Sequence, residues 1–419
     1  MRLAYVYSIS ERTYDGISDG ENYDAVAFNI ASGNGYTDAS GNLTSRRAPL
    51  APAFFALIYF FFGHSINAVR IAQAFMGAFT CFVIYLLGKE IFTRKVGLTA
   101  AAIAAIYPSF LFFTGELFTE TILVFTLTLS FYFLLKKNGS KYLNFVLSGI
   151  FFAAATLGRP SVLLLPFSIF FILAVFKAED SKEMLKKAVL LILTMLIIIC
   201  PWTLRNYLVH KDFVLVSTDF GYNTISSYFY PAKGFGFQNH ELVDKLTEGA
   251  KSETEIDKIL TNYTMRNLAK NPGKFIKLLP LKFLWFWEPF GGEDYNLDSS
   301  YDFIYGLVFL FFLFGLIGSR YMWRNLLPIY TAIFYFVLIS LVLYPSRRFR
   351  MQIEPFLIIL ASYGLYRAAE ERKKNKIVSF VVTLGLAANL FFFIFADSVK
   401  NFSKKIAFIS GYNAFHGDK

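Results

Sequence analysis

Long apolar stretches dominate this sequence and limit what it can fold into. About ten of them can cross the roughly 30 Å of hydrocarbon in a bilayer as helices, and segments with the alternating pattern of barrel strands are missing. With 55% hydrophobic residues, 50 Phe and a mean hydropathy of +0.47, a soluble chain would leave large apolar areas in water. The sequence therefore predicts an all-α, polytopic membrane helix bundle.

The expected spanning helices follow one another with mostly short connections. They cover residues 67–88, 96–113, 117–136, 142–158, 160–176, 186–203, 301–318, 324–344, 351–367 and 376–396. The segment 49–63 is too short and too rich in proline at its start for a span, so we expect an interfacial or re-entrant helix there.

Lys and Arg are distributed unevenly between the two sets of alternate loops. One set carries seventeen of them, in residues 89–95, 136–141, 177–187, 320–324 and 367–376, and the other carries four, Arg159, Arg347, Arg348 and Arg350. Loops rich in positive charge face the cytoplasm. This bias accounts for most of the formal charge of +11 without a nucleic acid partner. We expect the remaining loops at the outer face of the cell membrane.

An N-terminus at the outer face needs a segment that carries it across the membrane. Residues 1–7 have neither the length nor the apolar run of a signal peptide or a span. The simplest account is that one further spanning helix precedes Met1 and that residues 2–7 are its outer end. Unaided translocation of a short tail is the alternative.

Loop lengths divide the chain into five expected regions. These are a first outer loop with interfacial helices (1–66), a first half of the bundle (67–203), an outer loop region (204–300), a second half of the bundle (301–396) and a short outer tail (397–419). The region 204–300 is too long for a plain connector and should be partly ordered. Within it we expect an amphipathic helix that stops near Asn271-Pro272, then a Lys- and Trp-rich helix at headgroup level.

Acidic residues at the expected outer face are the first candidates for chemistry. Asp19 precedes a helical pattern, so its carboxylate would lie at a helix N-terminus on the membrane surface; an N-cap role of Ser18 or Asp19 is the structural alternative. Glu116 and Glu120 lie four residues apart in a short outer turn and would share one helix face. Carboxylates at hydrocarbon depth are costly and usually line a polar cavity, which favours a functional role for this pair.

Arginines form the second set of candidates. They lie near the expected outer face of the membrane, whose loops otherwise contain few Lys and Arg residues. They are Arg46, Arg47, Arg159, Arg205, Arg348 and Arg350. Contacts with lipid headgroups are the alternative explanation. A forked guanidinium matches a phosphate, and a lipid-linked phosphate would lie at this depth. Carboxylates and arginines together favour transfer from a lipid-phosphate donor to a hydroxyl acceptor, with a carboxylate as base and arginines at the leaving phosphate.

Other chemistries have little support in the sequence. The four histidines have no metal-ligand spacing, and both cysteines lie within apolar runs. No Gly-rich phosphate loop and no Ser/His/Asp set is legible. We expect no cofactor and no metal.

Two other classes of protein are weighed against an enzyme. A polytopic transporter or lipid flippase would place charged groups at mid-membrane on broken helices, whereas the expected spans here are almost free of charge. A structural or assembly protein would need no cluster of acids and bases at one face. The acidic and basic candidates gather at one face of the membrane while the spans are almost free of charge, and this favours chemistry at the membrane surface.

Six motifs in this order and topology resemble those of the GT-C membrane glycosyltransferases. The resemblance is to the bacterial relatives of protein O-mannosyltransferases and lipid A aminoarabinose transferases, glycosyltransferase family 39, and it covers nearly the whole chain. The motifs are SDGENYDAVAFNIASGNGY, RRAPLAPAFFALIYFFFG, YPSFLFFTGELFTETILVF, LGRPSVLLLPF, PWTLRNYLVHKDFVLVSTDFGYN and RRFRMQIEPFLIILASYGL. The resemblance implies a polyprenyl-phosphate sugar donor, a lipid, glycan or protein acceptor, inversion at the anomeric carbon, and a site facing the periplasm or exterior.

The resemblance also implies roles for single residues. Asp19 matches the acidic position in the first outer loop, which activates or orients the acceptor, and Glu120 matches the second acidic position, with Glu116 one turn earlier. The residues expected to contact the donor phosphate are Arg47, Arg348, Arg350 and Arg159. Tyr23 and Arg205 are expected to contact the acceptor or to serve a structural role. Two departures from the family pattern are the missing first helix and the short tail after the last span.

Overall fold

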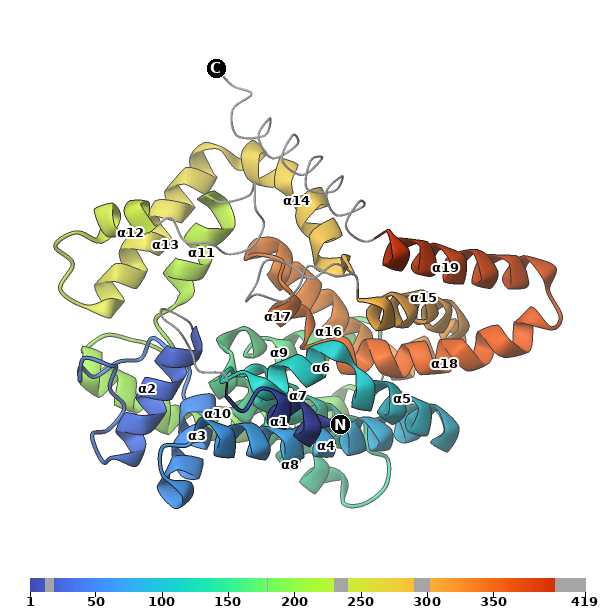
Figure 1. Cartoon of the computed structure of the whole chain (residues 1–419), viewed down its shortest axis with the longest axis horizontal. Helices are drawn as coiled ribbons and strands as arrows, with labels where there is room; N and C mark the ends of the chain where they lie inside the picture. Colours follow the sequence, from blue (N-terminus) through green and yellow to red (C-terminus); the bar gives the residue numbers. More distant parts are fainter. Residues whose placement is uncertain (12–18, 179, 230–239, 290–301, 396–419) are drawn as a thin grey trace.

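Helices build the described part of the protein (Figure 1). The structure is a computed structural model, and it describes residues 1–11, 19–178, 180–229, 240–289 and 302–395. Within these ranges the only β pairing is an isolated bridge between Thr37 and Leu43. The all-α class expected from the sequence is confirmed, while Ser18 and the expected tail 397–419 lie outside the described residues.

The described helices form a multi-pass membrane bundle. Those long and apolar enough to cross a membrane are α4 (Ile66–Ile91), α10 (Ser181–His210), the run Arg320–Val342 made by η3 (Arg320–Met322) and α16 (Trp323–Val342), and α19 (Lys376–Ile394). A fifth crossing is formed if α5 (Arg94–Ile106) and α6 (Pro108–Gly115), bent by 49°, are one span. Shorter apolar helices are α3 (Leu50–Phe62), α7 (Glu120–Leu135), α8 (Lys141–Gly158), α9 (Leu165–Val175) and α15 (Phe303–Gly318).

The sequence predicts about ten full spans, but in the structure several of these segments are divided into two helices or are shorter than a full span. The expected helix 96–113 breaks at Tyr107-Pro108, because a residue before proline is pushed out of the helical conformation, and Tyr107 has φ −69° and ψ 120°. The expected helix 160–176 starts with a 3₁₀ turn, η1 (Pro160–Val162), which shortens the α-helix after it. Proline therefore divides long apolar runs here into two pieces.

The first nine residues of helix α18 (Glu354–Arg372) are all buried. The helix packs against α15 with almost no space between the two backbones. A Cβ atom at Gly364 would lie 2.0 Å from the carbonyl oxygen of Phe311, and one at Gly315 would lie 2.1 Å from that of Leu360. Only glycine permits this approach. The short helix α17 (Arg347–Arg350) comes directly before the buried start of α18.

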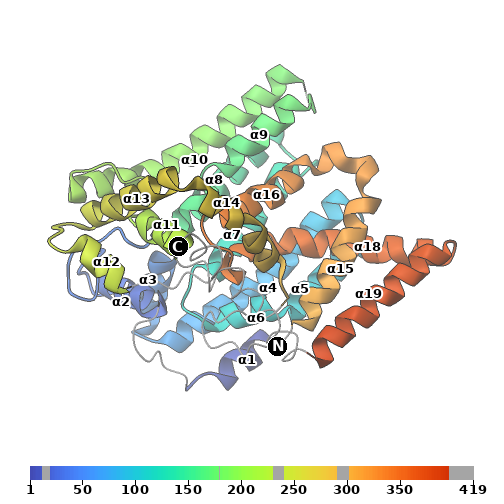
Figure 2. The same cartoon turned by 90° about the horizontal axis from the view of Figure 1, so that it is seen from above.

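The outer loop region contains four more helices. They are α11 (Phe220–Phe229), α12 (His240–Thr247), α13 (Glu253–Lys270) and α14 (Pro272–Trp287). The break expected near Asn271-Pro272 is present between α13 and α14. A small apolar core of Ile225, Val243 and Leu260 joins α11, α12 and α13. These three helices lie on the same side of the molecule as α2 (Asp19–Ala31) in both views (Figures 1 and 2).

Helices α1 to α3 lie at the edge of this bundle. The short helix α1 (Arg2–Ser8) packs on α4 and α6, where the Nη1 atom of buried Arg2 donates to the carbonyl oxygen of Phe110 at 2.7 Å. Helix α2 packs on α3, and α3 in turn contacts α4 and α8. Asp19 is thus brought to the ends of α7 and α8, far from it in the sequence.

Candidate active site

Five separate segments of the chain bring charged side chains to one place. Asp19 is the first residue of α2, Glu120 the first residue of α7, and Arg348 lies in α17. Arg47 stands in the loop before α3, and Arg159 directly follows α8. All five lie at helix ends or in loops, so the cluster depends on how the helices pack.

Arg348 connects the two acidic residues of this cluster. Its Nη1 atom donates to Oδ2 of Asp19 at 2.6 Å, and its Nε atom donates to Oε1 of Glu120 at 2.5 Å. Arg47 donates from Nη2 to the other Asp19 oxygen, Oδ1, at 2.5 Å. Arg159 donates from Nη2 to Oε1 of Glu120 at 3.1 Å and from Nη1 to the carbonyl oxygen of Arg348 at 3.2 Å. The result is a continuous charged network.

Burial increases from one end of the network to the other. The Asp19 side chain is 26% exposed and the Glu120 side chain is fully buried, with the three guanidinium groups between these values. Three arginines face two carboxylates, which leaves a formal charge of +1. Such a cluster, accessible at Asp19 and closed at Glu120, suits an anion that approaches from the Asp19 end.

Aromatic rings surround the guanidinium groups. The ring of Phe118 lies 4.7 Å from the guanidinium carbon of Arg348, and that of Phe349 lies 4.6 Å from that of Arg159. Cation–π contacts of this kind stabilise positive charge and limit side-chain movement. The arginines are therefore held in place before any substrate binds.

Two buried polar atoms in the network have no hydrogen-bond partner among the residues that the structure describes. They are Nε of Arg47, a donor, and Oε2 of Glu120, an acceptor. A buried polar atom without a partner costs free energy, so such atoms in a folded protein call for an explanation. Unused donor and acceptor capacity beside a charged cluster is typical of a binding site for a polar ligand.

Tyr23 lies beside Arg47, with its ring 5.3 Å from the guanidinium carbon. Burial raises the pKa of Tyr23, and the positive charges of Arg47 and Arg348 oppose that rise. Burial lowers the pKa of Arg47, but the negative charge of the Asp19 carboxylate outweighs it, so this pKa is raised overall. Tyr23 is thus a neutral phenol, and Arg47 stays positively charged.

Glu116 has a different position from the one expected. It was expected to share a helix face with Glu120, but α6 ends at Gly115 and α7 begins at Glu120, so the two glutamates lie on either side of a bend. Glu116 is buried, and its carbonyl oxygen accepts a hydrogen bond from Nε2 of Gln73 at 2.9 Å. Residues 116–119, between the end of α6 and the start of α7, are not helical, and this separates the pair.

Arg350 lies in a second cluster. Its Nε atom is 3.2 Å from Oε1 of Glu354, its Nη1 atom donates to the carbonyl oxygens of Phe286 and Glu288, and its guanidinium carbon lies 3.7 Å from the Tyr305 ring centre. Arg350 thus connects α17 to α14, α15 and α18. The expected phosphate contact of Arg350 competes with these protein partners.

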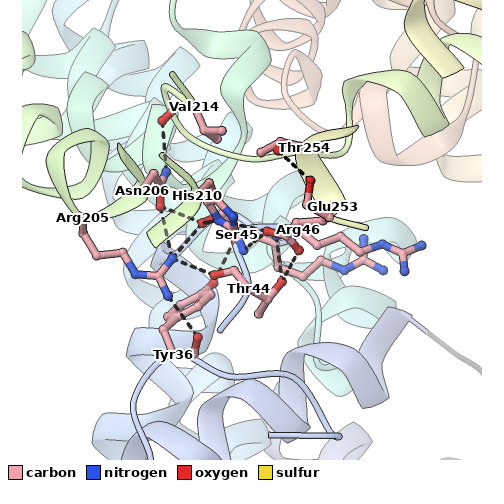
Figure 3. Close-up of polar contacts among 12 residues, drawn as sticks. Tyr36, Thr44, Ser45, Arg46, Arg205, Asn206, His210, Val214, Glu253 and Thr254 are labelled. Carbon is pink, nitrogen blue, oxygen red and sulfur yellow. Dashed lines mark hydrogen bonds and ion pairs between the residues drawn. The ribbon is translucent and has the colours of Figure 1, made fainter. Parts of the chain in front are cut away.

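Arg205 connects α10 to the loop before α3 (Figure 3). Its Nη1 atom donates to the carbonyl oxygen of Thr44 and to Oγ of Ser45, both at 2.7 Å, and its Nη2 atom donates to the carbonyl oxygen of Tyr36 at 3.1 Å. Its guanidinium carbon also lies 4.9 Å from the Trp202 ring centre. Of its two expected roles, these contacts fit the structural one.

Sequence reasoning missed several residues of this region. Ser45, His210 and Glu253 meet around the same loop, although they are far apart in the chain and no local pattern links them (Figure 3). Arg347 stands in the same basic segment as Arg348 and Arg350, and the sequence alone indicates no role for it. Among the described residues it forms no ion pair and donates no hydrogen bond, and burial and neighbouring Arg350 lower its pKa.

In the described ranges, no three His, Cys, Asp or Glu side chains are grouped closely enough to hold a metal ion.

Comparison with known proteins adds two findings. Residues 46–204 match the family model of dolichyl-phosphate-mannose-protein mannosyltransferases. No protein with a curated description matches the sequence. The matched region includes Arg47, Glu120 and Arg159 of the charged cluster. It ends before α11, so Arg348 lies outside it.

Solved structures of two glycosyltransferases are similar to the chain. The archaeal oligosaccharyltransferase AglB from Archaeoglobus fulgidus, in complex with an inhibitory peptide and a dolichol-phosphate, is 15% identical with a TM-score of 0.54, covering 99% of this chain and 56% of that one. ArnT from Cupriavidus metallidurans, bound to undecaprenyl phosphate, is 13% identical with a TM-score of 0.46, covering 88% and 77%. This chain thus spans little more than half the length of AglB. The likeness to AglB shows the GT-C fold.

Proposed function

We propose that the chain is a membrane glycosyltransferase with the GT-C fold, and that it transfers a sugar from a polyprenyl-phosphate donor to a hydroxyl group of a lipid, glycan or protein. The transfer takes place at the outer face of the membrane, in line with the bias of Lys and Arg towards the opposite loops. The donor is held by a lipid tail in the bilayer and by its phosphate at the charged cluster.

The observation that carries this proposal is the network around Arg348. A lone carboxylate or a lone arginine at a membrane surface has simpler explanations. Here Asp19 and Glu120 both pair with Arg348, and each also pairs with a second arginine, Arg47 or Arg159. The chemistry requires this combination. A base must take the acceptor proton, and positive charge must stabilise the phosphate that leaves.

Asp19 acts as the base in the proposed reaction. Its side chain is 26% exposed, so a substrate hydroxyl can reach the carboxylate that Arg47 and Arg348 hold in place. The acceptor O–H proton passes to Asp19 while the acceptor oxygen forms a bond to the anomeric carbon. The bond from that carbon to the phosphate oxygen breaks, and its electron pair stays on the phosphate. One displacement of this kind inverts the anomeric configuration.

The arginines and Glu120 have the complementary task. Arg47, Arg159 and Arg348 offer the positive charge that a leaving phosphate needs, and the buried Glu120 carboxylate holds two of them in position. Glu120 is itself a poor candidate for the base, since its side chain is fully buried. Arg347, which has no ion pair within the described residues, is a further candidate for the phosphate.

A transporter or flippase would also need polar groups within a bundle. It would place them along a path through the membrane, whereas the paired acids and bases of this cluster lie at the ends of helices that meet at one face. The cluster also uses each carboxylate in ion pairs, as expected for positioned catalytic groups. This arrangement favours chemistry at one face over passage across the membrane.

Mass spectrometry of cell-envelope lipids and glycoproteins tests the proposal. We compare cells with the wild-type gene, without the gene, and with the Asp19→Asn variant. The expected result is that one hexose or pentose is lost from an envelope component in both altered strains, while its lipid-linked donor accumulates. Unchanged envelope sugars would refute the transferase, and a lipid that changes leaflet without loss of sugar would support a flippase instead.

A further inference from the structure

The segment 44–47 lies between the outer helices and the charged cluster. Residues 44–46 are held on one side by α10, α11 and α13 (Figure 3). The next residue, Arg47, donates to Asp19 on the other side. The carbonyl oxygen of Arg47 also accepts a hydrogen bond from the hydroxyl of Tyr36 at 2.9 Å. A displacement of residues 44–46 would therefore move Arg47.

Glu253 makes the main contact from the outer helices to this segment. Its Oε1 atom accepts a hydrogen bond from the backbone N–H of Ser45 at 2.5 Å, and its Oε2 atom accepts one from Oγ1 of Thr44 at 2.8 Å. The carboxylate thus binds two consecutive residues with both of its oxygens. Hydrogen bonds to an ionised group are the stronger kind, so this contact fixes the local backbone.

Two further contacts hold the same residues on the outer helices. The backbone N–H of Thr218, just before α11, donates to the carbonyl oxygen of Ser45 at 3.1 Å. The guanidinium carbon of Arg46 lies 4.4 Å from the ring centre of Tyr222 in α11. The segment is therefore attached to the outer helices at Thr44, Ser45 and Arg46.

The Ser45 side chain connects the same point to α10. Its Oγ atom accepts from Arg205 and donates to Oδ1 of Asn206, both at 2.7 Å. It also lies 2.8 Å from Nε2 of His210, which is itself 3.1 Å from Oε1 of Glu253. Ser45, His210 and Glu253 do not form a catalytic relay. In a relay the two ring nitrogens of the histidine contact different partners, whereas here Nε2 of His210 contacts both the Ser45 hydroxyl and the Glu253 carboxylate. The contacts serve to hold the loop.

The outer helices that carry Glu253 pack closely together. The backbone N–H of Gly221 in α11 donates to Oδ1 of Asp257 in α13 at 2.6 Å, and a Cβ atom at Gly221 would lie 2.5 Å from the Asp257 carbonyl oxygen. Movement of α13 is thus tied to that of α11. The pair can transmit a displacement to Glu253 as one body.

We propose that Glu253 is a positioning residue that ties the outer helices α11 and α13 to Arg47, and through Arg47 sets the geometry of the donor-phosphate site. This inference rests on the proposed function, because it assigns the phosphate to the cluster of Arg47. The contacts of Glu253 in the described residues are with Thr44, Ser45 and His210, so we assign it no direct contact with the donor phosphate. It acts on the phosphate site through the Thr44 hydroxyl and the Ser45 backbone N–H.

The test compares Glu253→Gln with Glu255→Gln. Gln keeps the size of the side chain but replaces one acceptor oxygen with an N–H₂ group that faces a donor. Glu255 is exposed in the first turn of the same helix and accepts only from the backbone N–H of Lys251 among the contacts described, so it is a matched control. Full-length protein in lipid nanodiscs is used for all variants.

Two readouts are measured, and one needs no ligand. Hydrogen exchange followed by mass spectrometry is expected to be faster in residues 44–48 and 19–24 for Glu253→Gln, and unchanged for Glu255→Gln. Undecaprenyl phosphate is expected to bind about tenfold more weakly to Glu253→Gln, as for the loss of one charge-assisted hydrogen bond. In an Arg47→Lys background the same change is expected to have no further effect on binding, because the two residues act through one path.

Each result has a defined meaning. Exchange that stays at the wild-type rate in residues 44–48, or undecaprenyl phosphate binding equal to wild type in Glu253→Gln, would overturn the inference. Additive effects of Glu253→Gln and Arg47→Lys would also overturn it, since a purely structural role predicts additivity. Failure of the wild-type protein itself to bind undecaprenyl phosphate would instead contradict the proposed function.

Discussion

Arg348 and Asp19 form an ion pair at 2.6 Å although 329 positions separate them in the chain. Such a pair forms only when α2 and α17 have both packed onto the bundle. Since Arg348 also binds Glu120, the two carboxylates are tied to one guanidinium. A change at any of the three residues is therefore expected to affect the others, although the consequences differ with burial.

The Asp19→Asn variant tests the proposed base. Asn has nearly the same shape but cannot take a proton, so we expect sugar transfer to fall at least about a hundredfold, the range found when a general base is removed. Expression and thermal stability should stay close to wild type because Asp19 is partly exposed. Transfer by the purified protein, with a polyprenyl-phosphate sugar as donor, is the measurement.

Asp24 offers a matched control for that experiment. It lies in the same helix, α2, but contacts His64 at 3.0 Å rather than the arginines. Asp24→Asn should retain most of the transfer rate. Near-normal turnover of the Asp19 variant would show that another group takes the proton.

Arg348 and Arg350 are expected to respond differently to replacement by Lys. Lys keeps the charge but cannot bridge two carboxylates, so Arg348→Lys should weaken binding of undecaprenyl phosphate about tenfold, the value of one lost charge-assisted contact. Arg350 already uses Glu354 and two carbonyl oxygens. Its Lys variant should lower the midpoint of thermal unfolding and leave the affinity unchanged. Equal loss of affinity in both would place the phosphate at Arg350 as well.

Glu120→Gln tests the buried end of the network. The substitution leaves Arg159 and Arg348 without their shared carboxylate in a site that water does not reach, and breaking a buried pair in this way costs about 3 kcal/mol. We expect a correspondingly lower free energy of unfolding. Glu371→Gln is the control, because the Glu371–Arg367 pair is exposed and such pairs contribute little. Equal effects of the two changes would contradict the assigned role.

Residues that look equivalent in the sequence can have different partners in the folded protein, and the sequence alone cannot separate their roles. Arg348 and Arg350 look equivalent as sequence, yet on the short helix α17 they point about 200° apart, towards different partners. Glu116 and Glu120 look like neighbours on a helix, yet a bend separates them. Periodicity describes one helix at a time, so it cannot show where a helix begins when a proline lies nearby.

Contacts between distant segments were outside the reach of the sequence. The apolar runs and the bias of Lys and Arg suffice for an all-α membrane bundle, because they depend only on local composition. Asp19, Arg47 and Glu120 were recognised as single candidates, but their meeting at Arg348 depends on tertiary packing. Glu253 was not a candidate at all, since a charged residue in a long outer loop resembles any solvated one.

Gly364→Ala tests the close approach of α15 and α18. The added methyl group would lie 2.0 Å from the carbonyl oxygen of Phe311, so the helices must separate or bend. We expect a loss of at least about 1 to 3 kcal/mol in the free energy of unfolding, as for overpacked cores. Gly273→Ala in α14 meets nothing within 4 Å and should be neutral or slightly stabilising. Wild-type stability of the Gly364 variant would show that the two helices are not in this contact.

Lys282 makes stability depend on pH. The Nζ atom of this buried residue donates to Oγ of Ser227 and to the carbonyl oxygens of Leu341 and Leu343, at 2.6, 3.1 and 2.9 Å, and so joins α14 to α11 and to the end of α16. Burial lowers the pKa of Lys282 from 10.5 to about 7. Between pH 7 and 10 the unfolded chain therefore holds a proton that the folded protein has released.

The sign of the effect follows from this difference in bound protons. Stability rises with pH wherever the unfolded state binds more protons, by up to about 1.4 kcal/mol per pH unit for one group. We expect the unfolding midpoint of the wild-type protein, relative to that of Lys282→Met, to rise between pH 7 and 10 and to be flat below pH 6. Lys277→Met, at an exposed position of α14, should follow the wild-type curve. A difference between wild type and Lys282→Met that stays constant with pH would mean that the buried amine keeps its proton throughout, held by its three acceptors.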